Sequence, residues 1–354
     1  MSPVLDAPRS GPVVAAGSGD GITIGLINNM PDAALAATER QFIDLLRAAA
    51  RDTVIRLKLF SMPDVPRAVP MREELTERYR DVSELWNTRL DGLIVTGTEP
   101  RAANLKDEPY WPTLANVVEW ARTNTASTVW SCLAAHAAVL HADGIERSLL
   151  ADKQFGVFDC EVLAGQPMTK GLGRHLRVPH SRWNDLPEAA LASNGYQILA
   201  RSAAAGVDMF AGPERSFYSS FLFFQGHPEY EAGTLLREYR RDIGRYLRGE
   251  REHYPAIPEG YFNDEATALV NAFQARALHE RHEGLLAGFP MRALEAGLEV
   301  SWRRSAIGVY GTWLDYLKER KAARRTPTVS VHRPAHRTWP RGHVRPAADG
   351  SSAG

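Results

Sequence analysis

The chain has 354 residues, 44% of them hydrophobic, which allows one large α/β domain or two smaller domains, each with its own core. Lys and Arg number 42, as do Asp and Glu, so no global charge draws the protein to nucleic acid or a membrane surface. Two cysteines, Cys132 and Cys160, exclude a disulfide framework and a four-ligand zinc site. These features favour a reduced, cytoplasmic protein with small-molecule partners.

The two ends of the chain are expected to be flexible. Residues 1–21 lack the basic and apolar segments of a signal peptide and predict a flexible leader. Residues 321–354 are rich in Arg, Pro and His and predict a basic, disordered tail. No apolar run approaches the roughly 20 residues of a membrane-spanning helix. The folded domain is therefore expected over residues 22–320.

Strands and helices alternate along the first half of this domain. Apolar or alternating runs predict strands at 22–27, 54–60, 91–97 and 127–131, with helices at about 35–50 and 110–124. This alternation favours an α/β fold with a doubly wound, mainly parallel sheet flanked by helices. Later segments are more strand-like, and a helical part follows residue 233, including a charged helical run over about 263–286.

A cysteine stands at one of the predicted strand-to-helix junctions. Cys132 ends the segment STVWSC, and an Ala-rich helix follows it as far as Gly144. Unpaired N–H groups and the helix dipole at such a junction lower the pKa of a thiol, so thiolate forms near neutral pH. A single cysteine after an apolar strand is, by itself, more often a small buried apolar residue. A nucleophile therefore needs support from a second motif.

That support comes from the segment Gln225-Gly226-His227-Pro228-Glu229, which follows the apolar run FLFF. A nucleophile needs a base, and the base needs a group that orients it. Glu229 would hold the imidazole of His227 in one tautomer, and His227 would take the proton from Cys132 and later from an incoming alcohol. The three residues predict a catalytic triad.

The chain resembles the homoserine O-acyltransferase family of methionine biosynthesis, in particular the homoserine O-succinyltransferases, which have a class I glutamine amidotransferase-like fold. The resemblance covers about residues 22–320 in the right order. The matching segments are NNMP (28–31), ERQFIDLL (39–46), DGLIVTG (91–97), YWP (110–112), the Cys132 junction, KQFGVF (153–158), PHSRW (179–183), GHPEY (226–230), REYRRD (237–242) and SWRRSAIGVYGTWLDYL (301–317).

The resemblance implies a ping-pong acyl transfer. Cys132 would carry the acyl group as a thioester, His227 would accept protons and Glu229 would be its partner. The acyl group would pass from succinyl-CoA to the hydroxyl of L-homoserine, without a metal or an organic cofactor. Backbone N–H groups of Leu133 and of a residue near Gly97 would hold the oxyanion.

The resemblance also places the acceptor site at Lys153, Ser181 and Arg241. Homoserine is a zwitterion, and a guanidinium such as that of Arg241 can bind its carboxylate through two hydrogen bonds. The Ser181 hydroxyl and the Lys153 ammonium would add polar contacts. The resemblance further suggests a homodimer.

The acyl donor is predicted from Arg101, which aligns with the family position that tunes acyl-CoA choice. Arg101 is neither the acidic residue associated with acetyl transfer nor the small residue associated with succinyl transfer. A cation there would attract the free carboxylate of succinyl-CoA, which favours succinyl. Acetyl-CoA is the alternative donor, and Arg101→Glu is expected to shift the preference toward it.

Two other functions would use the same sequence features. A class I amidotransferase would hydrolyse glutamine with the same triad, but that class has glycines two residues before and after its cysteine, where this chain has Trp130 and Ala134. A noncatalytic binding module would have no need for an intact triad. An extra helical segment over about 257–300 contains HERHE (279–283), which favours a solvated helix over a metal site. It would shape the acceptor pocket or a dimer contact.

Overall fold

A computed structural model describes residues 13–15, 21–163, 165–213 and 219–325. Most of the expected leader (1–21) and tail (321–354) therefore lies outside the described residues. Within them, a short strand at Val13–Ala15 pairs with a sheet strand, and the last helix continues beyond residue 320 to Arg325.

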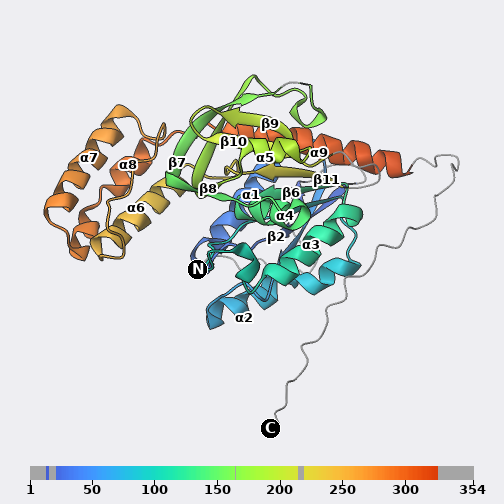
Figure 1. The fold of residues 1–354 in the computed structure, drawn as a ribbon, viewed down its shortest axis with the longest axis horizontal. Helices are drawn as coiled ribbons and strands as arrows, with labels where there is room; N and C mark the ends of the chain where they lie inside the picture. The colour runs from blue at the N-terminus through green and yellow to red at the C-terminus, as the bar shows by residue number, and fades with distance from the viewer. Residues whose placement is uncertain (1–12, 16–20, 164, 214–218, 326–354) are drawn as a thin grey trace, which may run out of the picture.

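Among the described residues, eleven strands form one sheet (Figure 1). Along the sheet their order is β1-β3-β2-β5-β6-β11-β10-β9-β7-β8, and β4 lies beside β3. The strands are β1 (Val13–Ala15), β2 (Ile22–Ile27), β3 (Ile55–Ser61), β4 (Arg80–Asp81), β5 (Gly92–Val95), β6 (Ser127–Ser131), β7 (Ser148–Val162), β8 (His175–Asp185), β9 (Gln197–Ser202), β10 (Gly206–Ala211) and β11 (Ser220–Phe224).

The central strands β3, β2, β5, β6 and β11 run parallel to one another. Strands β10, β9, β7 and β8 continue the sheet from β11 in antiparallel pairing. Every residue of β5 and β6 is buried, as expected for parallel strands covered on both faces. The predicted α/β architecture with a mainly parallel centre is confirmed.

Helices cover both faces of the sheet. On one face α1 and α9 share a core cluster with apolar residues of β2 and β3, and on the other α3 and α4 share a second cluster with β5 (Figure 1). Along β5, Leu93 and Val95 join the second cluster and Ile94 joins the first, because successive side chains of a strand point to opposite faces. The helices are α1 (Asp32–Ala49), α2 (Val69–Arg78), α3 (Trp111–Asn124), α4 (Leu133–Asp143), α5 (Glu188–Ser193) and α9 (Arg303–Arg325).

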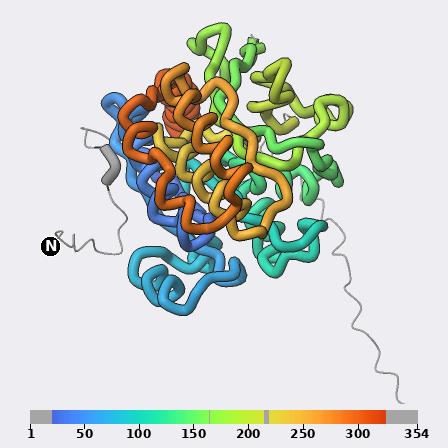
Figure 2. The backbone as a smooth tube through the Cα atoms, turned by 90° about the vertical axis from the view of Figure 1, so that its left-hand side faces the viewer, coloured from blue at the N-terminus to red at the C-terminus, as the bar shows by residue number. Residues whose placement is uncertain are grey.

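Three more helices, α6 (Thr234–Leu247), α7 (Asp264–His279) and α8 (Met291–Ala296), form a lobe beside β7 and β8 (Figures 1 and 2). Their apolar faces meet in a third core cluster, which includes Tyr239, Phe273 and Leu294. The prediction of a charged helical run over about 263–286 was wrong in extent. Helix α7 ends at His279, and a 3-10 helix follows at Glu283–Gly288.

The physical reason for this break is a contact back to α6. The guanidinium of Arg281 donates a hydrogen bond to the Tyr246 carbonyl at 2.8 Å and lies over the Tyr246 ring at 4.1 Å from its centroid. These contacts draw the chain away from the α7 axis, and a helical path through Arg281 would lose them.

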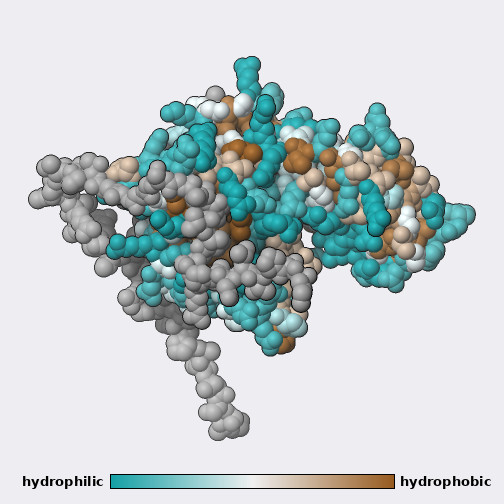
Figure 3. All heavy atoms as spheres, turned by 180° about the vertical axis from the view of Figure 1, so that it is seen from behind, coloured by the Kyte–Doolittle hydropathy of each residue, from teal (hydrophilic) through white to brown (hydrophobic). Residues whose placement is uncertain are grey.

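The face of the molecule seen in Figure 3 is largely hydrophilic, with apolar residues in scattered groups. The large apolar side chains that are exposed, such as Leu149 and Val69, come from separate elements. Within the described ranges, no helix has the length and apolar character needed to cross a membrane.

A buried polar network fixes the chain where β11 ends. The Gln225 amide oxygen accepts from His136 Nε2 at 2.9 Å and from the Leu186 N–H at 3.0 Å. Its amide nitrogen donates to Asp185 Oδ1 at 3.0 Å and to the Val207 carbonyl at 2.7 Å. A fully bonded buried amide of this kind holds its backbone in one position.

The next residue, Gly226, has no room for a side chain. Its N–H donates to Asp208 Oδ1 at 3.0 Å, and an added Cβ would lie 2.6 Å from that oxygen and 2.9 Å from His180 Nε2. The segment that carries His227 and Glu229 therefore packs directly on β8 and β10.

Gly226→Ala is expected to lower the free energy of unfolding by about 1–3 kcal/mol, because the added methyl group overpacks a buried polar contact. Urea unfolding measures this loss. Gly212→Ala is the matched control, since a Cβ there would lie 3.5 Å from Phe221 Cβ, an ordinary contact. Equal stability of the two variants would contradict the packing described for Gly226.

Candidate active site

Cys132 forms a sharp turn between β6 and α4. Its φ of 52° and ψ of −118° lie in a region that residues with a side chain rarely occupy, at a cost of about 1–3 kcal/mol. The Cys132 N–H donates to the Phe224 carbonyl at 2.7 Å, which ties the turn to the end of β11. The thiol is partly exposed at the N-terminus of α4, where the helix dipole favours an anion. The strained backbone thus presents the sulfur outward at the sheet edge.

His227 and Glu229 lie beside this turn, on the segment that follows β11. His227 Nδ1 is 2.9 Å from Glu229 Oε1, and both side chains are buried. The His227 N–H donates to the Pro179 carbonyl at 2.7 Å, which fixes the segment to β8. A carboxylate only accepts, so the neutral ring carries its proton on Nδ1 and leaves Nε2 for the thiol.

The charges of the three groups are coupled. Burial alone would lower the pKa of His227, but the Cys132 thiolate and the Glu229 carboxylate, which both hydrogen-bond the ring, raise that pKa well above its ordinary value. A protonated imidazole stabilises a neighbouring thiolate as a thiolate–imidazolium pair. Such a pair supplies both a nucleophile and a proton donor.

Two backbone groups predicted to hold an oxyanion lie side by side. A Cβ on Gly97 would be 2.9 Å from the Leu133 nitrogen, so the loop after β5 touches the first turn of α4. Leu133 is the first residue of α4, and the N–H groups there have no partner within the helix. The assignment of these groups stays a prediction, and their location next to Cys132 supports it.

The three residues predicted to bind substrate come together from β7, β8 and α6. Lys153 Nζ lies 2.9 Å from Asp242 Oδ2, and Arg241 Nη2 lies 3.0 Å from Asp242 Oδ1. Ser181 Oγ donates to Glu238 Oε2, and Lys153 Nζ is 3.8 Å from the same oxygen. Lys153, Ser181 and Arg241 therefore belong to one ionic cluster.

This cluster is joined to the triad through Tyr230. The Tyr230 ring stacks on His227 with centroids 4.3 Å apart, and its hydroxyl donates to Glu238 Oε1 at 2.7 Å. A molecule bound at the cluster would thus lie next to the base.

Asp242 holds the cations of the cluster in place. Burial alone would raise its pKa, but Lys153, Arg241 and Arg251 lower that pKa below the ordinary value of an Asp. The carboxylate therefore remains ionised, and it is 1% exposed.

The family follows from comparison with known proteins. A family profile described as homoserine O-succinyltransferase matches residues 16–324. The chain belongs to the homoserine O-succinyltransferase family. A relative with that name from Bradyrhizobium japonicum is 50% identical to this chain, and the match covers 84% of this chain and 90% of the relative. Another, from Rhodopseudomonas palustris, is 49% identical, and the match covers 83% of this chain and 87% of the relative. The chain is therefore an acyltransferase of methionine biosynthesis that acts on small molecules.

Solved structures with a similar fold include two glutamine amidotransferases. One, from Methylobacillus Flagellatus, is 16% identical and has a TM-score of 0.45; the match covers 90% of this chain and 100% of that protein's chain. The other, from Thermotoga maritima, is 11% identical over 85% of this chain and 100% of its own, with a TM-score of 0.46. This likeness concerns the fold alone, and the acyltransferase assignment comes from the family and its named relatives.

Three polar residues that lie among the predicted site residues were not identified from the sequence. Glu238 and Asp242 supply the anionic groups of the ionic cluster, and Tyr230 links that cluster to His227. Glu238 and Asp242 are four residues apart on α6, a spacing that places both on one helix face. This spacing, together with the neighbouring Arg241, is visible in the sequence and could have identified Glu238 and Asp242 as candidates.

Arg101 lies on the loop after β5, and another acidic residue fixes its backbone. Glu108 Oε1 accepts from the Arg101 N–H at 2.5 Å and from the Ala102 N–H at 2.7 Å. Glu108 is 2% exposed, whereas Arg101 is exposed to solvent. The loop predicted to tune donor choice is thus held from inside the protein, with the Arg101 side chain at its outer surface.

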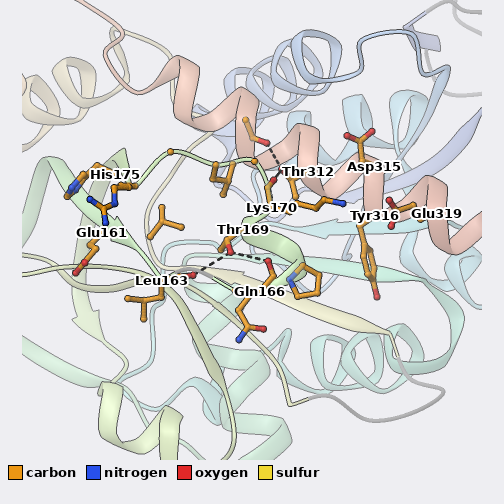
Figure 4. Close-up of a pocket in the computed structure, with 18 of the residues that line it drawn as sticks. Glu161, Leu163, Gln166, Thr169, Lys170, His175, Thr312, Asp315, Tyr316 and Glu319 are labelled. Carbon is orange, nitrogen blue, oxygen red and sulfur yellow. Dashed lines mark hydrogen bonds between the residues drawn. The ribbon is translucent and has the colours of Figure 1, made fainter.

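A separate groove lies between the loop that joins β7 to β8 and helix α9 (Figure 4). Its cavity volume is about 1440 Å³, and it is lined by residues that include Thr169, His175, Thr312 and Glu319. None of the predicted site residues lines this groove. The groove is therefore separate from the residues predicted to act in catalysis and substrate binding.

Glu229→Gln is expected to lower the pKa of His227, because the carboxylate that stabilises the imidazolium is lost while burial remains. The imidazolium that stabilises a neighbouring thiolate is then less populated, so the sulfur of Cys132 becomes less reactive. Alkylation of Cys132 by iodoacetamide, followed against pH, should be roughly tenfold slower near neutrality.

Glu231→Gln is the control for this experiment, because Glu231 pairs with Arg40 and Arg237 away from the imidazole. It should alkylate like the wild type. An unchanged pH profile in Glu229→Gln would show that Glu229 does not govern the charge of His227.

Proposed function

We propose that this chain transfers a succinyl group from succinyl-CoA to the hydroxyl of L-homoserine through a thioester on Cys132. The observation that carries the proposal is the contact between two groups of residues. The Cys132–His227–Glu229 triad adjoins, through Tyr230, a cluster of opposite charges suited to a zwitterion. The membership in the homoserine O-succinyltransferase family supports the same reaction.

The first half-reaction exchanges one thioester for another. The Cys132 thiolate attacks the thioester carbonyl, and the oxyanion lies near the N–H groups of Leu133 and the Gly97 loop. The intermediate collapses with loss of the coenzyme A thiolate, which takes a proton from the His227 imidazolium. A thiol suits this step because the attacking and leaving groups are both thiolates.

The second half-reaction uses His227 as a base. Neutral His227 Nε2 takes the proton of the homoserine hydroxyl as its oxygen attacks the Cys132 thioester. The tetrahedral intermediate expels the Cys132 thiolate, which restores the thiolate–imidazolium pair. No metal and no organic cofactor takes part in this sequence.

The acceptor site has charges of both signs, as an amino acid requires. We assign the homoserine carboxylate to Arg241, with Lys153 close by, and its ammonium to Glu238, whose oxygens already accept from Ser181 and Tyr230. Since Tyr230 stacks on His227, this orientation directs the acceptor side chain toward the base. We also place the enzyme in the cytoplasm, where the thiol of Cys132 stays reduced.

Intact-mass spectrometry of the purified protein tests the mechanism. The wild type mixed with succinyl-CoA should gain one succinyl group, and the adduct should disappear on addition of homoserine. Cys132→Ala should gain none. An acetyl adduct in place of a succinyl adduct would replace the donor and keep the mechanism, whereas glutamine hydrolysis without any adduct would favour an amidotransferase.

Arg241→Met is expected to raise the KM for homoserine about 10- to 100-fold, because a charge-assisted pair with the carboxylate is lost. Acylation by succinyl-CoA should change little, which steady-state and single-turnover kinetics can separate. Arg240→Met is the matched control, since the neighbouring residue on α6 points to another side of the helix. A normal KM in Arg241→Met would remove Arg241 from the acceptor site.

A further inference from the structure

A buried asparagine at the carboxyl end of β2 has no role in the mechanism above. Asn29 is 2% exposed and contacts the loop that follows β5. Its backbone N–H donates to Thr96 Oγ1 at 2.8 Å, and its side-chain amide donates to the Thr96 carbonyl at 3.1 Å. The Thr96 hydroxyl in turn donates to the Gly97 carbonyl at 3.1 Å. These bonds fix the two peptide groups on either side of Gly97.

The same bonds set the direction of the Gly97 N–H. Strand β5 lies between β2 and β6 in the sheet. The N–H and the carbonyl of Thr96 both bond on the β2 side, to the Ile27 carbonyl and to the Asn29 amide. A trans peptide group is planar, so its N–H points opposite to its carbonyl. The Gly97 N–H shares a peptide group with the Thr96 carbonyl and therefore points to the β6 side, where the chain turns at Cys132.

The Gly97 N–H is also free to accept a ligand as its partner. A Cβ on Gly97 would lie 2.9 Å from the Leu133 nitrogen, so Gly97 is in contact with the residue that follows Cys132. Gly97 is buried, and its N–H has no hydrogen-bond partner within the described part of the chain. A buried N–H without a partner is rare in folded proteins. An oxyanion formed at Cys132 would supply the missing acceptor.

We propose that Asn29 is a positioning residue for the oxyanion site. Its bonds to Thr96 hold the Gly97 N–H toward Cys132, where the carbonyl oxygen of a reacting acyl group becomes negative. This inference rests on the proposed function, because an oxyanion forms only if the thiolate attacks an acyl group. Without the Asn29 amide, the peptide group can rotate and its N–H turns away from that oxygen. Donors held in place before the reaction stabilise the transition state most, since they need no reorganisation.

Two reactions of Cys132 separate this role from a structural one. Acylation by succinyl-CoA passes through an oxyanion, whereas alkylation by iodoacetamide displaces iodide at a carbon atom and forms none. A change in the oxyanion site therefore slows acylation alone, and damage to the thiol or the fold slows both reactions. Intact-mass spectrometry of the full-length protein measures both rates, with acetyl-CoA as a second acyl donor, and urea unfolding measures stability.

Asn29→Ala should form the acyl adduct about 10- to 100-fold more slowly, somewhat less than the roughly 100- to 1000-fold cost of deleting an oxyanion donor. Its alkylation by iodoacetamide should proceed at the wild-type rate. Asn28→Ala is the matched control, because this neighbouring buried asparagine donates instead to the Leu35 carbonyl and the Tyr79 hydroxyl. The control loses at least as many hydrogen bonds but should acylate like the wild type.

Thr96→Val tests the same peptide groups independently and carries the test if Asn29→Ala fails to fold. It nearly keeps the shape of the side chain but removes the hydroxyl that bonds the Asn29 N–H and the Gly97 carbonyl. Acylation should slow and alkylation should not change. Thr96→Ser retains the hydroxyl and should recover most of the acylation rate.

Several results would overturn the assignment. Normal acylation in both Asn29→Ala and Thr96→Val would show that these bonds do not orient an oxyanion donor. An equal loss of acylation and alkylation, or the same acylation loss in Asn28→Ala, would assign the effect to packing. A wild type that forms no adduct with either acyl donor would reject the thioester mechanism itself, and with it this role of Asn29.

Discussion

The parallel pairing of β6 with β11 brings the two parts of the proposed catalytic site together. Ser131 pairs with Phe224 at the ends of these strands, and the next N–H of β6, that of Cys132, donates to the Phe224 carbonyl at 2.7 Å. The cysteine and the histidine segment therefore leave the sheet at the same edge, although about 90 residues of chain separate them. A change in this register would move the thiol away from His227.

Ion pairs lie close to this edge of the sheet. The ionic cluster balances Lys153 and Arg241 against Glu238 and Asp242. In the proposed reaction, homoserine brings a carboxylate and an ammonium to these charges.

The helical lobe contributes to the site through α6. Its apolar face packs on α7 and α8, so the polar face with Glu238 and Asp242 is held toward β7 and β8. Trp302, just before α9, donates its indole N–H to the Tyr230 carbonyl at 2.8 Å, which locks the residue that joins the lobe to the triad. The region expected as an added segment is thus part of the support for the acceptor site.

The amino-acid sequence by itself determined the strand–helix alternation, the cysteine junction and the His-Pro-Glu segment, because these depend on local periodicity and on residue chemistry. It also showed Glu238 and Asp242 one helical turn apart without showing what they face. Only the tertiary structure decided that Glu108 fixes the loop of Arg101 and that Tyr230 links His227 to the ionic cluster. These contacts join residues that are separate in the chain. Their partners are set by strand order and helix packing, which local patterns do not encode.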